Sequence, residues 1–130
     1  MENQGTALGE IGQIALTVPD LEEAKAFYRD VLGIPFLFDA GTVAFFQCGA
    51  VRLLIGAAEP GNPSAPVAGT ILYFRVGDLP AVAAALREKG VVFVQEPHLV
   101  AKMADHDLWL AFFQDPAGHT LGLMSELPRS

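Results

Sequence analysis

The chain offers few side chains that could do chemistry, and Gln13, His98 and His106 are the first to consider. Gln13 stands at the head of the apolar stretch "QIALTV", where its amide oxygen could bind a metal ion or orient a carbonyl or hydroxyl group of a ligand. A third use is a polar group at a strand end that hydrogen-bonds to backbone or water. The sequence leaves all three uses open for Gln13.

The two histidines lie in "EPHLVAKMADHDLW", residues 96–109. The pattern predicts a long connection between two strands, and long loops on compact domains are often functional. Imidazole exchanges protons near neutral pH, so His98 and His106 are the candidate catalytic residues. One alternative is a solvated loop in which Asp105 and Asp107 occupy turn and strand-edge positions. Another is a displaced metal site, for which the residue types are suitable but the spacing is not diagnostic.

Three further polar residues carry weaker signals. Arg75 falls on a predicted strand, so its charge must be paired or lie at an exposed end, and a carboxylate-bearing ligand is one candidate partner. His119, in "DPAGHTL", is predicted to be structural. Cys48 is next to Gly49 at a predicted turn, and nothing nearby indicates an activated thiolate.

The elements that must position these residues occur twice along the chain. In "LTVPDLEEAKAFYRDVLG" the apolar residues follow the three-and-four spacing of one helix face, with Asp20 as the N-cap and Gly33 as the stop. The same order returns in "FRVGDLPAVAAALREKG", where Asp78 is the cap and Gly90 the stop. The sequence therefore predicts helices near residues 20–32 and 78–89, each preceded by a strand.

Three further strands follow each predicted helix, which makes each half a βαβββ module. The first module covers about residues 10–57 and the second about 69–126, within one domain of residues 1–130. The stretch from about 58 to 68 is rich in Pro, Gly and Ala and is predicted to be a linker. The strand segments are "PFLFDA", "VAFFQCG" and "AVRLLIGA", then "VVFVQEP", "LWLAFFQDPAG" and "HTLGLMSE".

This order of elements, with "FYRDVLGI" in the first half and "DPAGHTLGLM" near the end, resembles the vicinal oxygen chelate superfamily. That superfamily includes glyoxalase I, methylmalonyl-CoA epimerase, extradiol dioxygenases and bleomycin-resistance proteins. The resemblance covers roughly residues 10–126 and implies an α+β fold. In that fold two βαβββ modules form a curved, eight-stranded mixed sheet, the cup, with the helices outside.

Metal-dependent members of the superfamily bind an ion through His, Gln or Glu side chains on four strands of the cup. The resemblance places these four positions on Gln13, on or beside Leu53, on Ile71 and on Gly122. Only Gln13 can act as a ligand, and one amide oxygen cannot offset the dehydration of a divalent ion. We therefore expect no metal at the usual site, and no other cofactor.

Strand alternation predicts that the lining of the cup is mostly apolar. Trp109, beside the connection, is a candidate for its wall. A ligand in the cup would contact Gln13, Leu53, Ile71, Tyr73, Arg75, Trp109, Gly122 and Met124. The absent side chain of Gly122 would leave volume for the ligand, and residues 97–107 would act as a lid.

Composition limits the partners. A net charge of −7 with scattered basic residues repels phosphate backbones, so we expect no nucleic-acid partner. Every apolar run is shorter than the roughly 20 residues of a membrane span, so we expect no membrane partner. The single cysteine and the absence of a signal-peptide pattern favour a cytoplasmic location. The resemblance implies a homodimer.

Three functions are compatible with the sequence. The first is a protein that, like bleomycin-resistance proteins, binds a small apolar or amphipathic molecule without a metal. The second is a metal-free enzyme that uses His98 or His106 for proton transfer. The third, a metal-dependent lyase, isomerase or dioxygenase, is opposed by the substitutions at three of the four ligand positions.

Overall fold

The computed structural model describes residues 7–58 and 69–128. The chain divides into two compact units, Met1–Pro63 and Ser64–Ser130, each with its own sheet and helix. Most of the stretch predicted to be a linker, residues 58–68, lies outside the described residues. No helix in the described ranges is long and apolar enough to cross a membrane.

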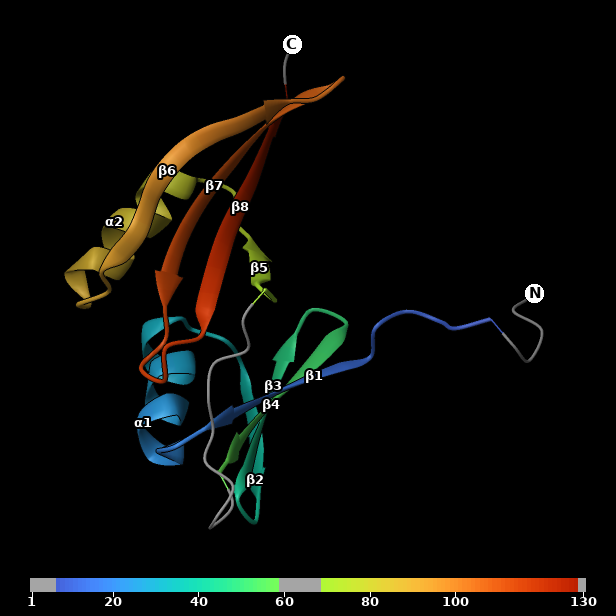
Figure 1. The fold of residues 1–130 in the computed structure, drawn as a ribbon, viewed down its shortest axis with the longest axis vertical. Coiled ribbons are helices and arrows are strands. Elements are labelled where there is room, and N and C mark those ends of the chain that lie inside the picture. The colour runs from blue at the N-terminus through green and yellow to red at the C-terminus, as the bar shows by residue number, and fades with distance from the viewer. Residues whose placement is uncertain (1–6, 59–68, 129–130) are drawn as a thin grey trace. The chain divides into compact units, whose positions relative to one another are not determined.

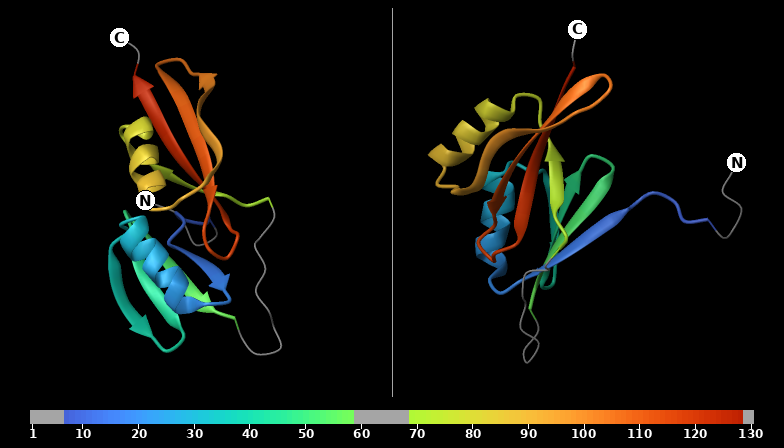
Figure 2. Two further views of the ribbon diagram at one scale, coloured as in Figure 1. Left: turned by 90° about the vertical axis from the view of Figure 1, so that its left-hand side faces the viewer. Right: turned by 45° about the horizontal axis from the view of Figure 1, so that its top comes forward.

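The first unit is a βαβββ module, as predicted (Figure 1). Its sheet has the strand order β1-β4-β3-β2, in which β1 and β4 are parallel and the other pairs antiparallel. The helical stretch lies across one face of this sheet (Figure 2). The elements are β1 Gln13–Val18, α1 Leu21–Ala26, η1 Phe27–Val31, β2 Phe36–Ala40, β3 Val43–Cys48 and β4 Val51–Ala57.

The second unit repeats this arrangement. Its strand order is β5-β8-β7-β6, with β5 and β8 parallel, and α2 packs on β6, β7 and β8. The eight predicted strands therefore form two four-stranded mixed sheets, each with a helix. The elements are β5 Leu72–Arg75, α2 Leu79–Glu88, β6 Phe93–Lys102, β7 His106–Gln114 and β8 Thr120–Pro128.

Both predicted helix caps are confirmed. The Asp20 carboxylate accepts from the backbone N–H of Glu23 at 3.0 Å, and the Asp78 carboxylate accepts from that of Ala81 at 3.1 Å. Gly33 and Gly90 have φ values of 73° and 95°, the left-handed conformation that glycine adopts most readily after a helix. The same residue types therefore start and stop the helical segment in each unit.

The first helical segment differs from the second in one respect that the sequence pattern did not predict. The stop glycine comes thirteen residues after the cap in the first unit and twelve after it in the second. The first unit accommodates the extra residue as a π-helical turn, η1, in which the backbone N–H of Leu32 donates to the Phe27 carbonyl at 2.9 Å. Both helical segments can therefore begin and end with the same caps despite their different lengths.

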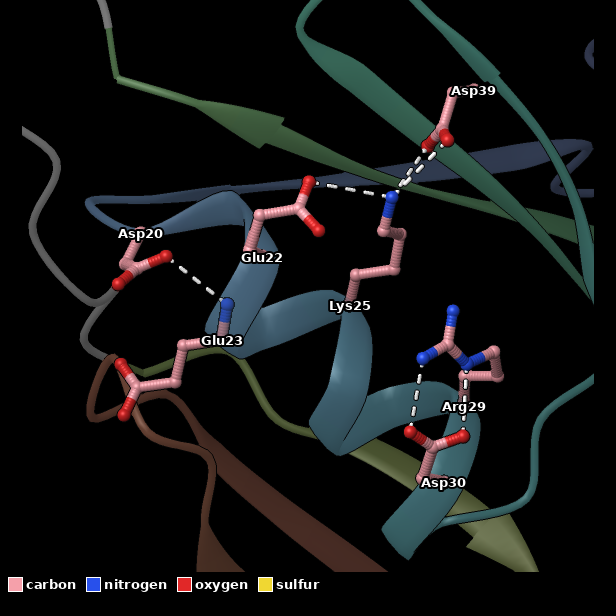
Figure 3. Close-up of polar contacts among 7 residues, drawn as sticks. All are labelled: Asp20, Glu22, Glu23, Lys25, Arg29, Asp30 and Asp39. Atoms are coloured by element: carbon pink, nitrogen blue, oxygen red, sulfur yellow. Dashed lines mark hydrogen bonds and ion pairs between the residues drawn. The ribbon is translucent and has the colours of Figure 1, made fainter.

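The core of the first unit lies between the helical segment and one face of the sheet. Tyr28 of η1 and Phe46 of β3 are fully buried, and their ring centroids are 6.2 Å apart. Lys25 connects the helix to the sheet at the edge of this core. Its ammonium group lies 3.1 Å from Asp39 Oδ2 on β2 and 3.4 Å from Glu22 Oε2 on α1 (Figure 3). The hydrogen bond to Asp39 raises the pKa of Lys25, which keeps the bridging charge in place.

The core of the second unit lies under α2. Ala111 and Phe113 of β7 are fully buried there, and Phe93 of β6 packs against Phe113 with ring centroids 5.6 Å apart. The guanidinium group of Arg87 on α2 lies 5.1 Å from the Phe93 ring centroid and pairs with Glu96. The helix is therefore fixed to the edge strand by both apolar and charged contacts.

The predicted long connection at residues 97–107 is wrong. The segment is a β-hairpin, because β6 continues to Lys102, β7 begins at His106, and the Met103 N–H donates to the His106 carbonyl at 2.8 Å. Pro97 and its polar neighbours resemble a loop in sequence. In the structure β6 is an edge strand with three register shifts, a setting in which proline is tolerated. The proposed lid is therefore part of the sheet.

Candidate functional site

Each sheet has a face opposite its helix, which we call its open face. Residues that are in register on neighbouring strands point to the same side of a sheet, so the pairings define these faces. The first open face carries Gln13, Ala15, Thr17, Phe38, Ala40, Val43, Phe45, Gln47, Arg52, Leu54 and Gly56. The second carries Tyr73, Arg75, His98, Ala101, His106, Leu108, Leu110, Phe112, Thr120, Gly122, Met124 and Glu126.

The first open face has a polar row beside an aromatic row. Gln13, Arg52 and Gln47 are in register across β1, β4 and β3. In the next row Phe45 stacks on Phe38, with ring centroids 4.7 Å apart and an interplanar angle of 12°. The Arg52 guanidinium carbon lies 6.0 Å from the Phe45 ring centroid and so links the two rows. Gln13 is exposed on this face.

Leu53 is not on this face, which corrects its predicted place in the lining. It is 2% exposed and in register with Ile14, so it points toward the helix, while Arg52 takes the position beside Gln13. The prediction counted along a family motif, and a shift of one residue moves every side chain of a strand to the other face. The sequence did contain a signal, since a lone arginine in "VRLLIG" is expected to face away from a core.

The second open face brings together four of the predicted ligand contacts. Tyr73 and Arg75 of β5 are in register with Gly122 and Met124 of β8. Ile71 precedes β5 and is half-buried. Two apolar residues that the sequence reasoning missed complete this surface, Leu110 and Phe112 of β7.

Gly122 does not leave an open volume, which corrects a second expectation. A Cβ atom built on it would lie 2.9 Å from Tyr73 Cδ2 and 3.3 Å from Phe112 Cε1. The rings of Tyr73 and Phe112 meet edge to face above the glycine, with centroids 5.8 Å apart. The missing side chain therefore makes room for Tyr73, a residue that remains 45% exposed.

His98 also lies on the second open face, beside this aromatic pair. Its ring centroid is 6.4 Å from that of Phe112, and it is in register with Leu110. Its Nδ1 lies 2.7 Å from the Glu96 carbonyl oxygen. Because a carbonyl only accepts hydrogen bonds, Nδ1 carries a proton, and Nε2 is the nitrogen that a neutral ring offers to a ligand proton.

A chain of polar contacts crosses the far end of this face. His106 Nδ1 lies 2.7 Å from Asp105 Oδ1, and His106 Nε2 lies 3.5 Å from Glu126 Oε2. The other Glu126 oxygen accepts from Arg75 Nε at 3.2 Å, so the charge of Arg75 is paired within the chain. The hydrogen bond from His106 lowers the pKa of Asp105. His98 and His106 thus share one face but have different surroundings.

The remaining candidates lie elsewhere. Trp109 is in register with Ser125, which is 1% exposed, and lies with Phe113 on the helix-covered face, not on the open face. His119 is 6% exposed, and its backbone N–H donates to the buried Asp115 carboxylate at 2.8 Å in the β7–β8 turn. Partial burial raises the pKa of the Cys48 thiol, which disfavours the reactive thiolate form.

The donor set does not fit a divalent metal ion. Gln13 supplies one neutral amide, Leu53 is buried under the helix, and neither Ile71 nor Gly122 has a side-chain donor. Within residues 7–58 and 69–128, no three His, Cys, Asp or Glu side chains lie together in a way that could hold a metal. Stable sites need three or four such ligands.

Two βαβββ modules, each with one helix-covered and one open sheet face, define the duplicated architecture that the sequence resemblance implied. The chain belongs to the glyoxalase/bleomycin resistance protein/dioxygenase superfamily, whose family model matches residues 10–123.

The similar proteins of known structure or name include both enzymes and binding proteins. The chain is 31% identical over 78 residues to mitochondrial methylmalonyl-CoA epimerase from Bos taurus, a match that covers 55% of this chain and 43% of the epimerase. Lactoylglutathione lyase from Agrobacterium tumefaciens has the same fold, with a TM-score of 0.71, 24% identity and coverage of 91% and 94% of the two chains. An antibiotic-binding protein from Streptomyces sp. CB03234 also has this fold, with a TM-score of 0.71 and 24% identity. The match covers 93% of this chain and 98% of the antibiotic-binding protein.

Proposed function

We propose that the protein binds a small, largely apolar or amphipathic molecule on the open faces of its sheets without a divalent metal. One observation carries the proposal. The open faces present aromatic and aliphatic side chains, whereas the four positions of the family's metal ligands offer a single donor, Gln13. This lining suits an apolar ligand better than a bound ion.

The second open face illustrates how such a ligand could be held. Tyr73 is 45% exposed beside Phe112, Leu110 and Met124, which together form an apolar surface with polar groups at its margin. Covering apolar surface contributes about 25 cal/mol per Å², so a ligand that covers 100 Å² gains roughly 2.5 kcal/mol before ordering costs. His98 and Arg75 could then orient the polar groups of the ligand.

A test of this proposal uses Nile red, an uncharged apolar dye whose fluorescence increases when it binds. Tyr73→Ala should weaken dye binding at least about fivefold, which corresponds to about 1 kcal/mol. Val92→Ala is the matched control, because Val92 is 82% exposed and lies outside the open-face set. No dye binding, or equal effects of the two substitutions, would contradict the proposal.

A second candidate function is a metal-free enzyme that transfers protons through His98. The observation that favours it is the hydrogen bond from Nδ1 to the Glu96 carbonyl, which fixes the ring and leaves Nε2 to act as a base. Deuterium uptake from D2O into carbon acids such as phenylpyruvate tests it. Exchange above the buffer rate that His98→Gln removes would support an enzyme, and exchange that the variant retains would count against His98.

The proposal includes a cytoplasmic homodimer. The lone Cys48 is compatible with a reducing compartment, since no disulfide can form within the chain. Exposed apolar side chains on the edge strand β2, Leu37 at 44% and Phe38 at 49%, are suited to contact with a second copy.

A further inference from the structure

We infer that the first open face binds a planar aromatic carboxylate, with the acid on Arg52 and the ring on the neighbouring aromatic row. This inference rests on the proposed binding function and adds the chemical class of one ligand. It depends on Arg52 and Gln13, which the β1–β4 register places side by side.

Arg52 differs from the other arginines in the described part of the chain. Arg29 pairs with Asp30, Arg75 with Glu126 and Arg87 with Glu96. Arg52 instead lies over the Phe45 ring, with its guanidinium carbon 6.0 Å from the ring centroid. The chain has fifteen acidic and eight basic residues, so acidic partners are plentiful. An exposed arginine on a sheet face that pairs with no carboxylate among residues 7–58 and 69–128 points to an anion from outside the chain.

The geometry of the guanidinium group suits a carboxylate. The guanidinium carbon lies 6.0 Å from the Phe45 ring centroid, and the N–H donors of a guanidinium lie in the plane of the group, where a carboxylate can accept two of them. Gln13 adds an amide on one side of Arg52. Gln47 on the other side is already engaged, because its Nε2 donates to the Gly49 carbonyl at 2.7 Å.

The next row of the sheet accounts for the aromatic part of the ligand. It carries Ala15, Leu54, Phe45 and Phe38 in register, and all of them are apolar. Alternate residues on a strand are about 6.8 Å apart, so a bicyclic aromatic acid reaches from the polar row onto this one. The stacked pair of Phe38 and Phe45 offers the ring a flat neighbour.

The experiment measures binding of 2-naphthoate to the full chain by isothermal titration calorimetry. Arg52→Gln should raise the Kd about tenfold, because it removes a charge-assisted pair. Arg29→Gln is the matched control, since Arg29 is an arginine of the same unit on η1, and it should change the Kd less than about twofold. Added NaCl should weaken binding to the unmodified chain more than to Arg52→Gln.

Two further ligands separate the acid from the ring. Methyl 2-naphthoate keeps the ring without the charge and should bind the unmodified chain and Arg52→Gln alike. Cyclohexanecarboxylate keeps the charge but has no aromatic ring. Phe45→Leu should therefore weaken binding of 2-naphthoate several-fold and leave binding of cyclohexanecarboxylate nearly unchanged.

The inference is overturned if 2-naphthoate does not bind, if it binds no better than its ester, or if both arginine substitutions have equal effects. Its failure is distinguishable from failure of the proposed function. If naphthoate binding fails while Nile red binding still depends on Tyr73, the proposed binding function stands and only the aromatic acid is refuted. If Nile red does not bind while naphthoate binding depends on Arg52, the aromatic acid stands and the apolar ligand of the proposed function is refuted.

Discussion

Arg52 and Tyr73 show how a single side chain can determine the character of a sheet face. Within the part of the chain that the structure describes, Arg52 contacts the Phe45 ring and no carboxylate, and Tyr73 occupies the space above Gly122. Neither arrangement follows from residue type alone, because each depends on the strand alongside. Two predictions at this scale test the packing around Gly122 and around Cys48.

Gly122→Ala should destabilise the fold by about 1 kcal/mol, since its Cβ would meet the Tyr73 ring at 2.9 Å and the ring must move. Urea unfolding measures the cost. In a Tyr73→Ala background the same substitution should cost clearly less, because the obstructing ring is gone. An equal cost in both backgrounds would show that the glycine is required for another reason.

Cys48 should react slowly with iodoacetamide. Burial raises the pKa of its thiol above the pKa in the unfolded chain, so at pH 8 the folded protein contains less thiolate than the unfolded chain. This difference in thiolate content disappears only when the pH rises past the raised pKa. Alkylation at pH 8 followed by mass spectrometry should therefore be slower in buffer than in urea. Faster reaction of the folded protein would indicate an activated thiolate.

Helices and strands were the part of the molecule that local patterns predicted best. The two helix starts depend on aspartate caps, and each cap contributes typically about 1 kcal/mol. Asp20→Ala and Asp78→Ala should each lower the free energy of unfolding by about that amount, as measured in urea. Asp107→Ala, a strand residue in register with Lys102, is a control that tests the loss of a carboxylate away from any cap. A loss below about 0.3 kcal/mol for both caps would contradict their role.

The sequence predicted the elements better than the faces. Period-two and period-3.6 patterns and the repeated caps are local, so the order of elements in both modules was predicted. The face of Leu53 depends on the register between β1 and β4, and that of Trp109 on the pairing of β7 with β8, which are long-range contacts. The hairpin at residues 97–107 was missed because an edge strand tolerates the proline and polar residues that also mark loops.

In the candidate site, too, local patterns predicted some residues and missed those that depend on neighbouring strands. Gln13, Tyr73, Arg75 and Met124 lie on the sheet faces opposite the helices, as their register shows. Arg52 and Phe112 were missed, since no single-strand pattern says which neighbours they meet. Whether any of these residues binds a ligand remains a prediction.

The whole molecule consists of two βαβββ modules, each with a sheet face opposite its helix. The proposed homodimer should elute with twice the mass of the 13.8 kDa chain in light scattering at micromolar concentration. Phe38→Glu, on an edge strand, should shift it toward the monomer by placing charge at an apolar contact. A monomeric unmodified chain would contradict the assembly without affecting the binding proposal.

Nile red binding before and after treatment with EDTA and dialysis tests most directly the claim that this chain binds small molecules without a metal. We expect the same Kd in both preparations, and no change when one equivalent of Zn²⁺, Mn²⁺, Ni²⁺ or Fe²⁺ is added, because the usual positions hold one amide donor. The claim is contradicted if dye binding is lost after EDTA and returns with one equivalent of metal. If the metal does not restore binding in Gln13→Ala, Gln13 is a metal ligand.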